Sequence, residues 1–280
     1  GSDAQKINHS NDWTESKDYQ TTYTRNFDLI HTQLKVSFNW EKQELNGVAE
    51  LTLKPYFYPS DSLILDAKAM DIKLIALIDE KQQQQKLSFT YDSLKLHIQL
   101  GRAFTRLDTL KLLIEYAAKP NEVISEGSHA IREAKGLYFI NPLGRNKLKA
   151  TQIWTQGETE ASSCWFPTID APNEKCTQEL YITTSQNYKT LSNGTLINSV
   201  LHGDSMRTDY WKQDQKHAPY LFMMAVGDFA VVQDYWQGIE VNYYVSPEDS
   251  ADARLVFGNT PLMLDFFSEK IGVKYPWSKY

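Results

Sequence analysis

Apolar and polar side chains alternate strictly over residues 33–40, and this pattern predicts the first β-strand of the chain. The apolar positions are Leu34, Val36, Phe38 and Trp40, with Gln33, Lys35, Ser37 and Asn39 between them. Successive side chains of a strand point to opposite faces, so the apolar set lines one half-buried face. Residues 48–53 alternate in the same way and predict a second strand. Between the two, Asn46-Gly47 predicts the hairpin turn, because this pair accommodates positive φ.

Further strand-like runs follow at short intervals, each bounded by turn residues. They span residues 62–66, 73–78, 86–90, 94–100, 109–116, 180–184, 206–212, 220–228, 230–235 and 239–245. The glutamine run 82–85 is expected in a polar hairpin loop, and the glycine-punctuated stretch 120–149 separates two groups of strands. Many short strands without helices between them indicate antiparallel sheets. We therefore predict a mainly β fold, a large antiparallel, sandwich-like domain.

The pattern changes at Ser246, where the sequence predicts the start of a helix. Ser246 offers an N-cap hydroxyl, and residues 247–249 supply a proline for the first helical position and two acids for the first turn. Apolar residues then recur at helical spacing from 255 to 271. Gly272 is suited to end the helix in a left-handed conformation. A C-terminal helical segment is therefore expected.

Pro261 interrupts this helical pattern, since proline removes a backbone donor and clashes with the preceding turn. It either kinks one helix or opens a second helix capped by Thr260. Few helical elements precede the segment, so its apolar stripe has no obvious partner in the predicted sheets. We expect the stripe to pack against structure beyond Tyr280.

The chain has 280 residues, 41% hydrophobic and 23% charged, which suits one large or two modest globular domains. A net charge of -6 and a pI near 5.6 give no basis for a nucleic-acid partner, because such proteins usually carry a clustered basic face. The longest apolar run, 220–226, is far shorter than the roughly 20 residues that span a bilayer, so no membrane span is predicted. Cys164 and Cys176 exclude a disulfide framework, allow one bridge, and leave the compartment open.

None of the six histidines opens an H-E-x-x-H helix, so the common zinc-peptidase motif is absent from this sequence. His129 and Glu133 are four residues apart and can share a helical face and a metal ion. They lie in a glycine-bounded segment that offers no third ligand, which zinc requires. We interpret both as solvated loop residues, and we predict no metal site and no catalytic residue in this chain.

Glu158 stands in the most informative part of the sequence. Residues 155–158 read Thr-Gln-Gly-Glu, and residues 164–172 read Cys-Trp-Phe-Pro-Thr-Ile-Asp-Ala-Pro. An acid beside a glycine, followed by a Pro-Asp-Pro turn, indicates a carboxylate held rigidly at a binding surface. The alternative from the residues alone is an ordinary surface acid, since Glu is mostly exposed. Cys164 and Asp170 are interpreted as structural, one as a packed thiol and the other as a turn-fixing acid.

These two segments closely resemble the Thr-Gln-x-Glu and Phe-Pro-x-x-Asp-x-Pro signature of zinc aminopeptidases of the aminopeptidase N and leukotriene A4 hydrolase type. Further similar segments are residues 135–139, 190–194, 218–221, 226–229 and 275–280. The likeness therefore runs from about Phe27 to the last residue. The positions that depart from the residues common in that family are Gly157, Ser163, Thr168 and Ala171. These departures concern the details of the first specificity pocket.

The resemblance implies a large, saddle-shaped antiparallel β domain over residues 21–245, after a disordered or extended segment 1–20. It implies that residues 246–280 begin a thermolysin-like catalytic domain whose zinc ligands lie beyond this chain. By the same resemblance, Glu158 is the carboxylate that reaches into the active site and holds the free α-ammonium of a peptide, and Gln156 lines the same pocket. Zinc is then expected in the full-length parent. The expected partners are the catalytic domain of the same parent chain and the peptide amino terminus, and the chain alone is expected to be inactive.

A rival hypothesis is a non-catalytic β-rich module, derived from the same domain, that binds a protein or peptide without hydrolysis. The sequence shows no metal motif, and likeness of fold does not carry function by itself. Zinc content and peptide hydrolysis by the longer protein separate the two hypotheses, since only the aminopeptidase requires both.

Overall fold

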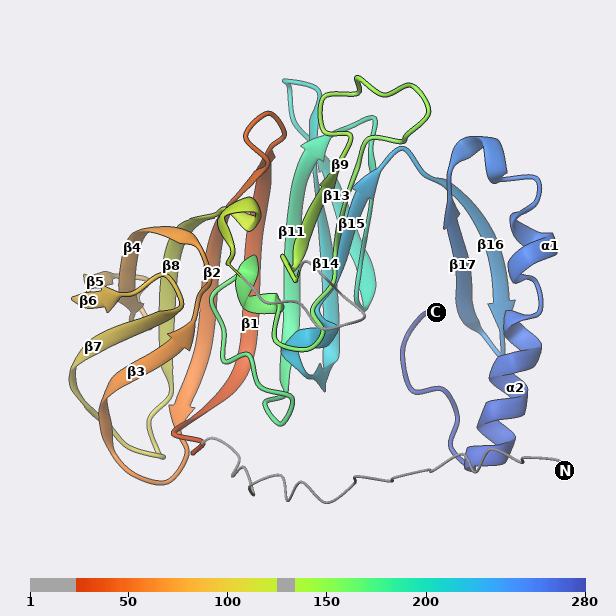
Figure 1. The fold of residues 1–280 in the computed structure, drawn as a ribbon. Helices are drawn as coiled ribbons and strands as arrows, with labels where there is room; N and C mark the ends of the chain where they lie inside the picture. The colour runs from red at the N-terminus through yellow and green to blue at the C-terminus, as the bar shows by residue number, and fades with distance from the viewer. Residues whose placement is uncertain (1–23, 125–133) are drawn as a thin grey trace, which may run out of the picture.

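The computed structural model describes residues 24–124 and 134–280, which form seventeen strands and two α-helices (Figure 1). The strands are β1 (Phe27–Asn39), β2 (Glu44–Pro55), β3 (Ser60–Asp66), β4 (Met70–Ile78), β5 (Gln84–Lys86), β6 (Phe89–Tyr91), β7 (Lys95–Phe104), β8 (Leu110–Ala118), β9 (Leu137–Ile140), β10 (Gln152–Thr155), β11 (Cys176–Ser185), β12 (Lys189–Ser192), β13 (Thr195–Leu201), β14 (Met206–His217), β15 (Met224–Gly227), β16 (Ala230–Trp236) and β17 (Ile239–Val245). The helices are α1 (Ala253–Phe257) and α2 (Thr260–Ile271). The predicted mainly β fold is confirmed. The segment 1–20, His129 and Glu133 lie outside the described residues.

Three sheets share the main hydrophobic core. The eight-stranded sheet has the order β13-β14-β11-β1-β2-β8-β4-β5, the four-stranded sheet the order β12-β15-β10-β9, and the three-stranded sheet the order β3-β7-β6. Buried side chains of all three belong to one cluster, for example Leu34 of β1, Ile153 of β10 and Leu96 of β7. The core therefore lies between the long sheet and the two smaller ones.

One strand pair differs from the predicted antiparallel arrangement. β1 and β11 run parallel, with Leu34 opposite Leu180. Parallel neighbours need a long crossover connection. After β8 the chain leaves the long sheet, forms β9 and β10 in the four-stranded sheet, and then returns as β11 beside β1. The long sheet is therefore mixed, which strand periodicity alone does not reveal.

The predicted Asn46-Gly47 turn is wrong, because both residues lie inside β2. The hairpin turns four residues earlier, between Asn39 and Glu44, where Gln43 takes the positive φ of 58°. Gly47 instead pairs with Tyr116 of β8, and a Cβ at Gly47 would lie 2.3 Å from the Tyr116 ring carbon Cζ. The glycine makes room for an aromatic ring.

Most of the predicted strands are present with slightly different ends, but two predicted runs divide. Run 86–90 splits between β5 and β6, which belong to different sheets. Run 220–228 splits into the 3-10 turn Pro219–Leu221 and β15. Of the glutamine run, residues 82 and 83 lie in the predicted loop and residues 84 and 85 open β5. The sequence did not predict β9, β10, β12 or β13, and all seven residues of β13 are exposed, so no apolar face marks it.

A second, smaller cluster joins the hairpin β16–β17 to the two helices (Figure 1). Its buried members are Trp236, Val241, Tyr243, Ala253 and Leu264. Trp236 Nε1 also donates a hydrogen bond of 2.6 Å to Asp265 Oδ1 on α2. The hairpin is therefore held to the helices by both apolar packing and a hydrogen bond.

The helical segment is present, but its starts differ from the prediction. Ser246 makes no side-chain cap, and the residues after it form the 3-10 turn Pro247–Asp249 before α1 begins. Pro261 does open a second helix, although Thr260 does not cap it: its hydroxyl donates to the Phe257 carbonyl at 2.7 Å. The predicted end is confirmed, because Gly272 follows α2 with a φ of 76°.

Cys164 and Cys176 are separate, buried thiols, so the bridge that the sequence allowed is not formed. Burial raises the pKa of each thiol to about 12, which keeps both protonated at neutral pH. The interpretation of Cys164 as a packed, structural residue is confirmed. In the described ranges neither helix is long and apolar enough to span a membrane.

Candidate functional site

Gln156 and Glu158 lie at the end of β10, on the four-stranded sheet. The Gln156 backbone N–H donates to the Gly136 carbonyl at 2.9 Å, which extends the β9–β10 ladder by one residue past Thr155. Side chains two residues apart on a strand share a face. The Gln156 side chain therefore shares a face with Trp154, opposite the face on which Ile153 is buried.

The structure brings the two predicted site residues together. Gln156 Nε2 lies 3.5 Å from Glu158 Oε2, at the limit of a hydrogen bond. The Glu158 side chain is exposed and Gln156 is half-buried. The pair presents a carboxylate oxygen and an amide at the surface, an arrangement that suits a cationic, hydrogen-bond-donating ligand.

Gly157 fixes the position of this pair. It is buried, and a Cβ there would lie 2.3 Å from the Tyr220 carbonyl oxygen and 2.6 Å from Ser162 Oγ. Ser162 Oγ in turn donates to the Pro219 carbonyl at 2.7 Å. The loop is pressed against the turn at Pro219–Leu221, so only glycine fits at this position. The departure from the family pattern at Gly157 thus has a steric reason.

Asp170 holds the far end of the same loop. Its Oδ2 accepts a hydrogen bond of 2.8 Å from the Ser163 backbone N–H, and its own N–H donates to Asp66 Oδ2 at 2.9 Å. Burial raises the pKa of the Asp170 carboxyl to about 6, although the hydrogen bonds from Ser163 act in the opposite direction. The interpretation of Asp170 as a turn-fixing acid is confirmed by these contacts.

An aromatic pair adjoins Gln156 on the same face of the sheet. Trp154 stacks on Tyr138 of the neighbouring strand, with ring centroids 4.4 Å apart and an interplanar angle of 16°. The Trp154 side chain remains 39% exposed. The row continues across the sheet through Ala225 to Leu191. The sequence analysis did not single out this row, because its members come from four separate strands.

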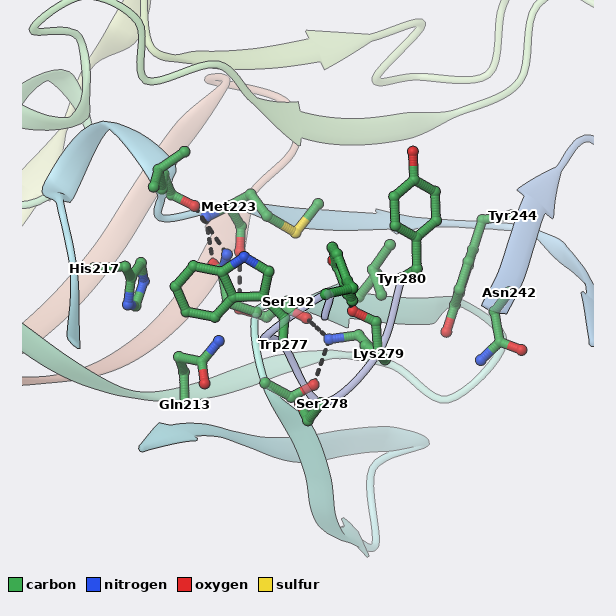
Figure 2. Close-up of a pocket in the computed structure, with 15 residues that line it drawn as sticks. Ser192, Gln213, His217, Met223, Asn242, Tyr244, Trp277, Ser278, Lys279 and Tyr280 are labelled. Carbon is green, nitrogen blue, oxygen red and sulfur yellow. Dashed lines mark hydrogen bonds between the residues drawn. The ribbon is translucent and has the colours of Figure 1, made fainter. Parts of the chain in front are cut away.

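Leu191 also belongs to the wall of a pocket of about 340 Å³ (Figure 2). The pocket lies between the β12–β13 turn, the Met223 loop, β17 and the segment 275–280. Figure 2 shows Tyr244 and Tyr280 toward one end and Trp277 with His217 toward the other. The sequence analysis did not predict this pocket, because its residues are distant from one another along the chain.

Lys279 ties the C-terminal segment to the main domain. Its Nζ donates to the carbonyl oxygens of Ser192 and Gly194, and it lies 4.8 Å from the centroid of the Trp211 ring. Burial lowers the pKa of Lys279 to about 8, opposed by the negative charge of Glu240. The lysine thus joins two parts of the fold through carbonyl dipoles and an aromatic face.

Over residues 24–124 and 134–280, no three His, Cys, Asp or Glu side chains are grouped closely enough to hold a metal ion. The donors present there do not fit a zinc site, and His129 and Glu133 are outside these ranges.

Comparison with solved structures shows the same fold in M1 zinc metallopeptidases. A mutant form of the M1 zinc metallopeptidase of Deinococcus radiodurans, bound to a Tyr-Ser-Ala substrate, matches with a TM-score of 0.75 and 19% sequence identity. The match covers 91% of this chain and 56% of that chain. A two-domain M1 zinc metallopeptidase bound to L-tryptophan matches with a TM-score of 0.76 and 18% identity, over 92% of this chain and 56% of that one.

Similar sequences include both aminopeptidases and a transcription factor. The puromycin-sensitive aminopeptidase of Caenorhabditis elegans is 23% identical, over 79% of this chain and 23% of that protein. Transcription initiation factor TFIID subunit 2 of Drosophila melanogaster is 22% identical, over 91% of this chain and 23% of that protein. The chain thus spans about a quarter of either relative. The model of the peptidase M1 N-terminal domain matches residues 18–221, well over half of the sequence, and the chain belongs to that family.

Proposed function

We propose that this chain is the amino-terminal part of a zinc aminopeptidase, in which Glu158 holds the free α-ammonium of a peptide and Gln156 lines the same pocket. The observation that carries the proposal is the packing of Gly157, which sets Glu158 at the end of a rigid strand with its carboxylate exposed. The Gln156 amide, 3.5 Å from that carboxylate, supports the same role.

The chemistry of an ammonium group explains why a carboxylate is needed. A desolvated ammonium requires a charged partner, and charge-assisted hydrogen bonds are stronger than neutral ones. An enzyme that requires this ion pair rejects internal peptide bonds, which have no free amine. The anchored amine also places the first peptide bond at a fixed distance from the catalytic groups. In this proposal a downstream domain holds the zinc, and this chain binds and orients the substrate.

The C-terminal helices support the expectation of a further domain. Large apolar side chains of α1 and α2 are between 45% and 85% exposed, namely Leu255, Val256, Phe257, Leu262, Met263, Phe266, Phe267 and Ile271. Exposed apolar surface of this extent marks an interaction site. We propose that the rest of the parent protein covers it. The boundary at Ser246 stays a prediction, and the packing of β16–β17 on the helices favours a start near Ala230.

The first test is the parent reading frame beyond Tyr280, which we expect to contain Gly-x-Met-Glu-Asn followed by H-E-x-x-H and a later glutamate. The longer protein is then purified and assayed for zinc content and for hydrolysis of aminoacyl amides. Hydrolysis of a free-amine substrate and none of its N-acetylated form is the expected result. A parent that lacks the zinc motif contradicts the proposal.

The second candidate function is a non-catalytic binding module derived from the same domain. One observation favours it: the chain is similar to transcription initiation factor TFIID subunit 2 from three species. In that case the longer protein holds no zinc and hydrolyses no peptide, and the exposed apolar surfaces contact a protein partner. The same two assays therefore decide between the candidates.

A further inference from the structure

The pocket beside Leu191 has the walls of a site for a planar, apolar group. Four of its lining residues are aromatic, namely Tyr244, Tyr275, Trp277 and Tyr280. Met223 and Leu191 add a thioether and an aliphatic side chain. Pockets of about 300 to 1,000 Å³ with apolar walls hold small molecules in known proteins, and this one has about 340 Å³. The volume and the walls suit one or two fused aromatic rings.

The charged side chain that lines the pocket disfavours a cationic occupant. Lys279 carries the one side-chain charge of the described lining at neutral pH, and Glu240, whose negative charge acts on Lys279, is not among the lining residues. His217 is neutral there, because burial lowers its pKa to about 4. The Lys279 ammonium already contacts two carbonyl oxygens and the Trp211 ring. It therefore acts on a molecule in the pocket through its positive charge and less as a hydrogen-bond donor. A second positive charge in the pocket is unfavourable.

The pocket also lies where the two hydrophobic clusters of the chain meet. Leu191 packs against the main core, and Tyr275 packs against the cluster formed by the β16–β17 hairpin and the helices. Beside it, Gln215 Nε2 donates to the Pro276 carbonyl at 2.7 Å, and Lys279 Nζ donates to the carbonyl oxygens of Ser192 and Gly194, so hydrogen bonds already join the two parts at the pocket. A molecule in the pocket contacts both clusters at once and stabilises their arrangement.

We propose that this pocket is a binding site for a small aromatic molecule without positive charge, which bridges the main β domain and the C-terminal unit. Its chemistry is opposite to that of the Glu158 surface, which suits an ammonium group. The described lining residues all belong to this chain, so binding to them can be tested without the proposed peptidase activity.

The test is titration of the 280-residue chain with three matched probes, naphthylmethanol, naphthylacetate and naphthylmethylammonium, by calorimetry at pH 6.5 and physiological salt. At that pH His217 is neutral and Lys279 is charged, because their pKa values are about 4 and about 8. The alcohol and the acetate bind saturably and raise the unfolding temperature. The ammonium probe binds at least tenfold more weakly. Equal or tighter binding of the ammonium probe overturns the proposal.

Two variants that fill the pocket locate the binding. Met223→Trp and Ser278→Phe each place an aromatic ring in the pocket, and each should weaken the binding of naphthylmethanol at least tenfold. Thermal unfolding shows whether each variant is folded. The matched control is Leu148→Trp, at a position that is 96% exposed and outside the pocket, and it leaves the affinity unchanged. Glu158→Ala also leaves it unchanged, whatever that variant does to peptidase activity. Unchanged affinity in a folded pocket-filling variant places the probe elsewhere and overturns the proposal.

Discussion

The ring of Tyr116 lies across the backbone of Gly47 on the neighbouring strand, inside the main core. A Cβ at Gly47 would be 2.3 Å from Tyr116 Cζ and 2.5 Å from its hydroxyl oxygen. Both residues are buried at the centre of the eight-stranded sheet. An aromatic ring that covers a glycine on the adjacent strand fills the space left by the missing side chain. The glycine and the aromatic ring therefore form one packing unit.

Gly47→Ala is expected to lower the free energy of unfolding by about 1 to 3 kcal/mol, the usual effect of overpacking a core. The Tyr116 ring must move to make room, and its neighbours leave it little space. Urea unfolding followed by fluorescence measures the change. The control is Gly203→Ala, where a Cβ meets nothing within 4 Å, and it should change stability by less than about 0.5 kcal/mol. Equal effects of the two substitutions would contradict the packing assignment.

Tyr116→Phe is expected to leave stability unchanged or to raise it. The Tyr116 hydroxyl is buried and has no hydrogen-bond partner among the described residues, so its removal ends a desolvation penalty of about 1 to 3 kcal/mol. The matched substitution is Tyr91→Phe. The Tyr91 hydroxyl donates to the Ala67 carbonyl at 2.9 Å and accepts from the Met70 N–H at 2.8 Å, so its loss destabilises. Loss of stability in Tyr116→Phe would show that its hydroxyl has a partner.

Stability is expected to fall as the pH drops from about 6.5 to about 4, in part through His217. Burial lowers the pKa of His217 to about 4, so between these values the unfolded chain binds the proton and the folded chain does not. Protonation therefore favours unfolding over this window. With about 1.36 kcal/mol per pKa unit, the effect is about 2 to 3 kcal/mol. His217→Gln removes this part of the slope in urea unfolding at a series of pH values, and an unchanged slope would contradict it.

Asp170 gives the opposite slope and serves as an internal comparison. Burial raises the pKa of its carboxyl to about 6, so between pH 4 and 6 the folded chain binds the proton that the unfolded chain releases. Its contribution to stability is therefore lost as the pH rises through this window. The slope of Asp170→Asn should be steeper than that of the native chain, whereas that of His217→Gln should be shallower. Identical slopes in both variants would contradict the two assignments.

The strand pattern could be predicted wherever one face of a strand is buried, and it failed where that condition is absent. Residues 33–36 of β1 alternate because Leu34 and Val36 enter the core while Gln33 and Lys35 lie on the other face. β13 lies at the edge of the long sheet with all its residues exposed, so its sequence carries no period. The turn predicted at Asn46-Gly47 was wrong because the glycine makes a cross-strand contact with Tyr116. That contact joins residues 69 positions apart and is not visible in the local sequence.

The candidate site was likewise predicted from the sequence only in part. Gln156 and Glu158 could be predicted from the sequence because both belong to one short segment, residues 155–158, that resembles the aminopeptidase signature. Trp154 was not singled out, although its exposure beside the buried Ile153 on β10 follows from the alternation of that strand. The aromatic pocket could not be predicted, because Met223, Tyr244 and Trp277 meet only through the packing of the C-terminal unit on the main domain.

Gly157→Ala is expected to destabilise the loop that carries the candidate site. The new methyl group meets the Tyr220 carbonyl oxygen at 2.3 Å, and backbone on both sides must shift. The expected change in the free energy of unfolding is about 1 to 3 kcal/mol. Amide hydrogen exchange at residues 156–163 should accelerate in the variant. The control is Gly238→Ala, where open space surrounds the Cβ but the φ of +85° strains any side chain, so it destabilises without affecting exchange at the loop.

In the longer protein, Glu158→Ala is expected to reduce kcat/KM for aminoacyl amides by the equivalent of about 2 to 5 kcal/mol, as loss of a partner of a buried charge pair does. The substrate ammonium then enters the site without a counter-charge. Glu160→Ala is the matched control, because Glu160 is an exposed acid two residues further along the same loop. Its kinetics should match those of the native enzyme within about twofold. If Glu158→Ala retains native kinetics, or if both variants lose activity equally, Glu158 does not hold the amine.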